Sequence, residues 1–139
     1  MATRASEQLD HALIRTFNHA SMPAFAKGVE VKFNGDDQLL QASGANDVAA
    51  IGITVYANAA GKPATIALYG NAVVVVTVGT GDASRGVDAV HVADGFTDAA
   101  ANGGGTTSQI IRGKFLQSGV ATNEIEMLIG GVNSRSVKA

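Results

Sequence analysis

The sequence of 139 residues contains no cysteine and no tryptophan, and only two prolines. Without cysteine the chain can have neither a disulfide framework nor a thiolate metal or redox site. Charged residues make up 16% of the chain, and the net charge is −2. A general nucleic-acid-binding protein needs a basic face that displaces counterions from phosphate, so this charge balance argues against that class.

Long apolar runs are also missing. The longest unbroken run, Ala72 to Val76, has five residues, whereas a membrane-spanning helix needs about 20. The first seven residues lack the apolar segment of a secretory signal. We therefore expect a soluble protein that is made in a reducing cytoplasm and has no membrane partner. A chain of 14.1 kDa buries about two-thirds of its surface on folding, which is enough for one domain with its arms.

The spacings of the common catalytic and ligand-binding motifs are absent. Gly81 and Gly86 have the spacing of the P-loop glycines, but Val87 stands where the phosphate-binding lysine would be. Ser84 lacks the preceding glycine that a nucleophile elbow requires. No two histidines have the spacing of helical metal ligands, so we expect His11, His19 and His91 at the surface. These absences predict a protein that is not an enzyme and has no cofactor, no metal and no small-molecule substrate.

Residues 1–28 differ from the rest in their periodicity. Leu9, Leu13 and Phe17 recur every four residues, which predicts an amphipathic helix of about three turns that ends before Pro23. A helix this short is marginal in water, so it must pack either on its own domain or on another protein. In the second alternative, residues 1–28 are an arm with large apolar anchors for a partner. These anchors are Leu9, Leu13, Ile14, Phe17, Met22 and Phe25.

From residue 29 onward the apolar residues alternate with polar ones, which is typical of half-buried strands. Short strands separated by Gly, Asn and Asp turns predict an all-β barrel or sandwich. We place this domain at residues 29–132, followed by a frayed tail at 133–139. Strands are expected at 29–33, 39–40, 51–55, 66–68, 73–78, 87–92, from 110 onward and at 125–129, with residues 98–108 as a loop.

The sequence also contains a weak internal repeat. Residues 51–70 resemble residues 112–130, since each segment has a glycine-led strand, a turn of small residues and a second strand that ends at glycine. We interpret this as one hairpin used twice, although any two hairpins share these features. The hairpin glycines are Gly52, Gly70, Gly113 and Gly130.

Five segments stand in a characteristic order, in a background rich in Ala, Gly, Val and Thr: Ala49–Tyr56, Gly70–Val75, Val78–Gly81, Ala93–Asp98 and Gly113–Gly119. In this order they resemble the small head decoration proteins, or capsid cement proteins, of tailed bacteriophages. The similarity extends from about Val29 to Gly130. No single segment is a diagnostic motif, and the signal lies in their order.

The resemblance implies a compact β-barrel or β-tulip domain and a structural role in the virion. Such a protein binds the major capsid protein on the outer surface of the expanded head, as trimers at three-fold and quasi-three-fold sites, and stabilises the head. It would be synthesised in the cytoplasm of the bacterial host. The family's N-terminal segment often runs along the capsid, so the helix expected here departs from the pattern. The alternatives are another virion part, such as a head-fibre base or a tail-tube subunit, and a small ligand-binding β-barrel.

Overall fold

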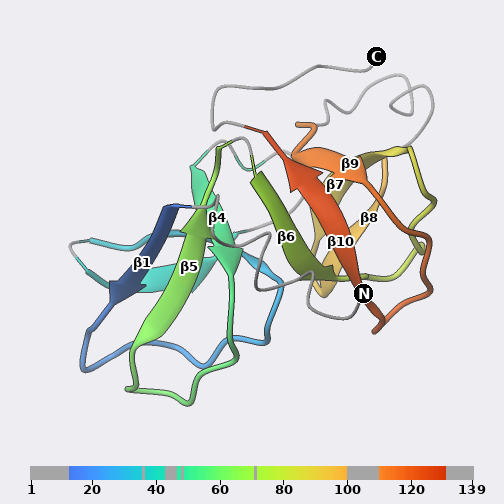
Figure 1. The fold of residues 1–139 in the computed structure, drawn as a ribbon. Helices are drawn as coiled ribbons and strands as arrows, with labels where there is room; N and C mark the ends of the chain where they lie inside the picture. The colour runs from blue at the N-terminus through green and yellow to red at the C-terminus, as the bar shows by residue number, and fades with distance from the viewer. Residues whose placement is uncertain are drawn as a thin grey trace, which may run out of the picture.

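The structure of the protein, a computed structural model, describes residues 13–35, 37–42, 47, 49–70, 72–99 and 110–130. These residues form ten strands and no helix, so the prediction of an all-β fold is confirmed. The strands make two antiparallel five-stranded sheets, which lie side by side and do not join into one closed barrel (Figure 1).

The first sheet contains the strands of residues 13–70, which we call the first half. In spatial order, it consists of β1 (Leu13–Phe17), β5 (Ala64–Leu68), β4 (Ala50–Thr54), β2 (Glu30–Phe33) and β3 (Leu39–Gln41).

The second sheet contains the strands of residues 72–130, the second half. In spatial order, it consists of β6 (Ala72–Thr77), β10 (Glu124–Ile129), β9 (Gly113–Phe115), β7 (Asp88–Val92) and β8 (Gly95–Asp98). Numbered within each half, both sheets have the same strand order, 1-5-4-2-3, and every pairing is antiparallel.

The equivalence of the halves extends to single residues. Gly52 pairs with Leu68 in the first sheet, and Gly113 pairs with Ile129 in the second. The loop before β2 and the loop before β7 each contain a glycine with positive φ, Gly28 at 76° and Gly86 at 84°. The internal repeat predicted for one hairpin therefore covers the whole fold.

The helix predicted for the N-terminal segment is wrong where the structure describes it, because residues 13–17 form strand β1. Leu13 pairs with Leu68 and Phe17 with Ala64, along the edge of the first sheet. Residues four apart share a face in a strand as well as in a helix, because four is a multiple of two. The spacing of Leu13 and Phe17 was thus compatible with both elements.

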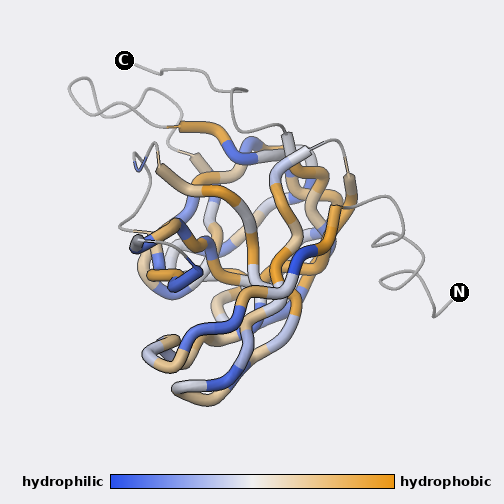
Figure 2. The backbone as a smooth tube through the Cα atoms, turned by 90° about the vertical axis from the view of Figure 1, so that its left-hand side faces the viewer, coloured by the Kyte–Doolittle hydropathy of each residue, from blue (hydrophilic) through white to orange (hydrophobic). Residues whose placement is uncertain are grey.

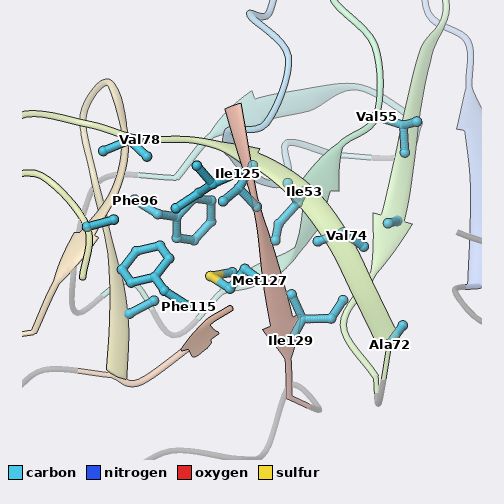
Figure 3. Packing of buried hydrophobic residues seen from close by; sticks show 14 residues of the cluster. Ile53, Val55, Ala72, Val74, Val78, Phe96, Phe115, Ile125, Met127 and Ile129 are labelled. Atoms are coloured by element: carbon cyan, nitrogen blue, oxygen red, sulfur yellow. The ribbon is translucent and has the colours of Figure 1, made fainter. Parts of the chain in front are cut away.

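Two clusters of buried side chains form the core. One belongs to the first half and includes Met22, Val31, Leu39 and Ile66. The other fills the second half but also takes in Ile53, Val55 and Ala67 of the first half. Figure 3 shows Ile53 of β4 lying next to Val74 of β6 and Met127 of β10. The second cluster therefore joins the two sheets.

The hydropathy of the chain follows this packing. In β6 the burial alternates along the strand, with Ala72, Val74 and Val76 buried and the residues between them half-buried. Figure 2 shows hydrophobic stretches running through the body of the molecule, whereas the loops at the bottom of that view are polar or only weakly hydrophobic. The β-branched run at 73–78 is typical of a strand buried on both faces. It forms strand β6, but with one face buried and the other half-buried.

Candidate functional site

Strand β1 carries three of the predicted anchor residues at the edge of the first sheet. One edge of β1 pairs with β5, and no other described strand pairs with its opposite edge. Leu13 is 65% exposed and Ile14 is 37% exposed, while Phe17 is half-buried against the ring of Phe33. Leu9, the first predicted anchor, lies outside the described residues.

The other two predicted anchors lie in the protein's own core. Met22 is 1% exposed and Phe25 is 5% exposed, and both pack in the cluster of the first half. The backbone N–H of Phe25 donates a hydrogen bond to Asn58 Oδ1 at 3.1 Å, which fixes this segment against the rest of the half. Their side chains are therefore not available to a partner, because they already stabilise the fold.

An open groove of about 400 Å³ lies beside β1 on the face that β1 shares with β5. Most of its lining is apolar, and its one charged side chain, Arg15, has its guanidinium 6.0 Å from the centre of the Phe17 ring. We call it the first-half groove. Its lining residues are Leu13, Arg15, Phe17, Phe33, Ile51, Leu68 and Tyr69.

The second half exposes apolar side chains that were not among the predicted site residues. Leu128 is 44% exposed in β10, and Leu116 is 37% exposed just after β9. The sequence carries a signal for Leu128, because it stands between Met127 and Ile129, at a position where strand alternation calls for a polar residue.

A buried ionic cluster lies between the two halves. Glu30 of β2 and His91 of β7 are fully buried, and Arg112, which precedes β9, is 5% exposed. Arg112 Nε lies 2.5 Å from Glu30 Oε2, and Arg112 Nη2 donates to Glu30 Oε1 at 3.2 Å. The hydroxyl of Tyr69 donates to Glu30, and Arg112 also donates to the carbonyl of Asp47. The cluster thus ties β2 and the end of β5 to the second sheet.

His91 takes part in this cluster as a neutral ring. Its Nε2 accepts a hydrogen bond from the backbone N–H of Glu30 at 3.1 Å, so the ring proton sits on Nδ1. Nδ1 is 3.7 Å from Glu30 Oε1, which is too long for a hydrogen bond. The expectation that His91 lies at the surface is wrong, since β7 carries it into the space between the sheets.

Burial dominates the electrostatics of the cluster. It raises the pKa of Glu30 to about 7, against the opposing effects of the Arg112 guanidinium and the Tyr69 hydrogen bond. It lowers the pKa of His91 to about 4, and the nearby Arg112 acts in the same direction. The pKa of Tyr69 is raised well above its ordinary value, first by burial and then by the Glu30 carboxylate. Because the cluster is closed to solvent, it can hold the halves together but offers no access to a substrate.

The predicted hairpin glycines occupy different kinds of position. Gly52 lies within β4 and Gly113 begins β9, and at both a side chain would meet the neighbouring strand. A Cβ at Gly52 would lie 2.4 Å from the carbonyl oxygen of Ala67, and one at Gly113 would lie 2.1 Å from that of Leu128. Gly70, soon after β5, faces open space, and Gly130 directly follows β10.

Two kinds of functional feature are absent from the described residues. No helix among them is long and apolar enough to cross a membrane. Within the same ranges, no three acidic or histidine side chains come together in a group that could hold a metal ion. The exposed features of the described residues include the open groove, the edge strand and the two leucines of the second half.

Comparisons with known proteins agree with this description of the fold. No protein-family profile matches the chain, and no curated protein matches its sequence. Among solved structures, the chain is similar to the head fiber gp8.5 N base of bacteriophage phi29, with a TM-score of 0.61 and 16% identity. The alignment covers 89% of this chain and 98% of that one. At this identity the likeness shows that the two chains share a fold.

Proposed function

We propose that this protein is a structural component of a tailed-phage virion and is bound to the outside of the head. The observation that carries the proposal is the likeness in fold to a phage head-fibre base, which spans nearly the whole of both chains. The order of sequence segments, which resembles head decoration proteins, supports the same location from an independent direction. Both lines support the proposal of a structural protein on the head surface.

The exposed features of the chain fit a binding role. An edge strand such as β1, whose outer edge pairs with no other described strand, can accept a strand of another protein, and the main-chain hydrogen bonds then supply affinity. We propose that the N-terminal segment, up to the edge of β1, contacts the major capsid protein. Leu9 and Ile14 remain as its proposed anchors, while Met22 and Phe25 serve the core.

Within the virion, the specific role that we propose is that of a decoration protein, present as trimers at three-fold and quasi-three-fold sites. Binding at many equivalent sites would stabilise the head by mass action, since the protein binds the assembled lattice and not its separated subunits. The second candidate is the base of a head fibre, favoured by the same likeness in fold. The two roles differ in what stands above the bound domain: nothing further for a decoration protein, a projecting fibre for a base.

Purified expanded heads that lack the protein test the proposal directly. We expect the full chain to co-sediment with these heads and to saturate at a fixed number of copies. Image reconstruction of the decorated heads should place its density at the three-fold and quasi-three-fold positions. Failure of the full chain to bind any head, or density on the tail, would overturn the proposal. A variant lacking residues 2–12 tests the N-terminal contact separately. If that variant bound heads at wild-type occupancy, a contact through these residues would be excluded, but the proposed place on the head would stand.

A further inference from the structure

The two halves of the molecule contact each other through unlike surfaces. On the first half the contact surface is a row of paired residues on adjacent strands, Glu30, Ile53 and Ala67. The Glu30 carboxylate meets Arg112 and His91 of the second half, while Ile53 and Ala67 share one buried cluster with Ala72, Val74 and Ile129. We call these three paired residues the first-half row.

The surface that receives the first-half row is the counterpart of the first-half groove. Equivalent strands of the two sheets pair at equivalent residues. The pair Leu13–Leu68 of the first sheet matches Ala72–Ile129 of the second. The pair Phe33–Leu39 likewise matches His91–Phe96. The backbone bond from Tyr69 N to Ile51 O matches the bond from Gly130 N to Arg112 O. This register gives six residues of the first-half groove a counterpart in the second half: Ala72 for Leu13, Val74 for Arg15, Val76 for Phe17, His91 for Phe33, Arg112 for Ile51 and Ile129 for Leu68. The groove of the second half is therefore filled by the first half.

Each half has both kinds of surface, and the contact between the halves uses only the first-half row and the groove of the second half. The first-half groove is open, and Leu13 on its wall is 65% exposed. On the second half, the residues that correspond to the first-half row are Asp88, Lys114 and Leu128, which are paired across β7, β9 and β10. We call them the second-half row. Leu128 is 44% exposed, and the ammonium of Lys114 lies 3.2 Å from Asp88 Oδ1, so the pair adds no net charge to this surface.

We propose that the second-half row of one copy docks in the first-half groove of the next copy, as the first-half row docks in the second half within each chain. Leu128 would take the place that Ala67 has inside the molecule and cover the apolar wall formed by Leu13 and Leu68. The docking rests on this apolar contact, because Asp88 is already paired with Lys114 within its own chain.

This contact joins unlike surfaces, so it must run head to tail. The β1 edge and the β9–β10 hairpin lie on different sides of the molecule, as Figure 1 shows, and the other two surfaces are already used within the chain. A head-to-tail contact closes into a ring when the rotation between copies allows it. With three copies, the ring would contain six equivalent halves. The inference concerns contacts between copies, so its failure would leave the proposed place on the head untouched.

Two exposed positions test the contact, Leu13 in the groove and Leu128 in the row. We expect wild-type full chain to form an oligomer of fixed size in sedimentation velocity, and the single variants L13D and L128D to be monomers. Each variant should weaken self-association by at least about 100-fold, as expected for losing an apolar anchor at an interface centre. The matched control is Val120→Asp, because Val120 is 59% exposed and lies outside both surfaces; it should assemble like the wild type.

A mixture of the two monomeric variants distinguishes this geometry from a symmetric one. L13D keeps an intact row and L128D keeps an intact groove, so we expect an equimolar mixture to form a one-to-one dimer that neither variant forms alone. Circular dichroism of each variant checks that the fold is intact. The proposal is overturned if the wild type stays monomeric at concentrations on the order of 1 mM, if either variant assembles normally, or if the mixture stays monomeric.

Disulfide trapping gives a second, independent measurement, because the chain has no cysteine of its own. The single variants L13C and L128C are mixed and oxidised, since a disulfide needs the two Cα atoms within about 7 Å. From an equimolar mixture we expect the mixed disulfide to make up nearly all of the linked product. A statistical distribution, in which the mixed disulfide is twice as abundant as each self-linked dimer, would show only random collision and would contradict the proposed contact.

Discussion

At the scale of single residues, two glycines allow adjacent strands to approach closely at the same place in each half. A Cβ at Gly113 would lie 2.1 Å from the carbonyl oxygen of Leu128, a distance that side-chain rearrangement cannot relieve because the obstacle is backbone. We expect Gly113→Ala to lower the free energy of unfolding by about 3 kcal/mol or more, at the upper end of overpacking effects. Urea denaturation of the variant measures this loss.

The matched control for that substitution is Gly70→Ala, because a Cβ at Gly70 would meet nothing within 4 Å. The control should change the free energy of unfolding by less than about 0.5 kcal/mol, as for other surface substitutions. Similar losses for both variants would mean that β9 and β10 do not approach as closely as described.

The buried ionic cluster makes a second prediction, about pH. The folded pKa of Glu30, about 7, lies above its ordinary value of 4.5, so between these pH values the folded chain holds more of this proton and stability falls as pH rises. The folded pKa of His91, about 4, lies below its ordinary value of 6.5, so its contribution rises with pH across that interval. The two contributions oppose each other, and we expect little net change between pH 4.5 and 6.5.

Replacing Glu30 removes one of these opposing contributions. With Glu30→Gln, only His91 remains, so the free energy of unfolding should rise with pH between 4.5 and 6.5, by up to about 1.4 kcal/mol per pH unit. Glu124→Gln, at a half-exposed carboxyl, is the control and should keep the flat profile. A flat profile for Glu30→Gln would refute this account.

At the scale of elements, the sequence predicted most strands and missed the two whose patterns are ambiguous. The alternation in 29–33, 51–55 and 125–129 marked strands correctly, but only β10 buries every second residue. Strand β2 buries Glu30 beside Val31, and β4 buries Ile53 beside Thr54, because these two strands lie against the second half. Strand β1 was read as a helix, since Leu13 and Phe17 fit both periods. Strand β8 was missed because it has only four residues, Gly95–Asp98, and a glycine-rich stretch of sequence follows it.

The functional features were less predictable than the strands. The groove depends on Leu13, Phe33 and Ile51, which come from three strands and meet only after the sheet has formed. The ionic cluster likewise joins Glu30 and Arg112 across 82 positions of the sequence, and no local pattern marks such a pair. The exposed Leu128 could have been found, because it breaks the polar side of an alternating strand.

Strand β1 also changes the expected effect of a truncation. If residues 1–28 were only an arm, deleting them would leave a folded domain. In the structure this deletion removes β1 and the buried side chains of Met22 and Phe25. Truncating one such side chain, Met22→Ala, should already cost about 2–5 kcal/mol. We therefore expect the deletion variant to lose the native near-ultraviolet circular dichroism, whereas a native spectrum would show that β2–β5 and the second half fold without residues 1–28.

At the scale of the whole molecule, the halves share a core and so should unfold together. Ile53 is 1% exposed and lies in the cluster of the second half, and Thr77 N donates to Gly28 O across the boundary at 3.3 Å. We expect one calorimetric transition, with the van't Hoff enthalpy equal to the measured enthalpy, as for a small cooperative domain. Ile53→Ala should lower the stability of both halves at once, by about 2–5 kcal/mol, because it leaves a cavity between the sheets.

The control for this cooperativity is Val120→Ala, since Val120 is 59% exposed and belongs to neither buried cluster. It should shift the transition by little and leave its shape unchanged. Two resolved transitions in the wild type, with Ile53→Ala shifting only one of them, would show that the halves are independent modules. In that case the contact between halves would be too weak to serve as the template for a contact between copies, so this measurement also bears on the proposed ring.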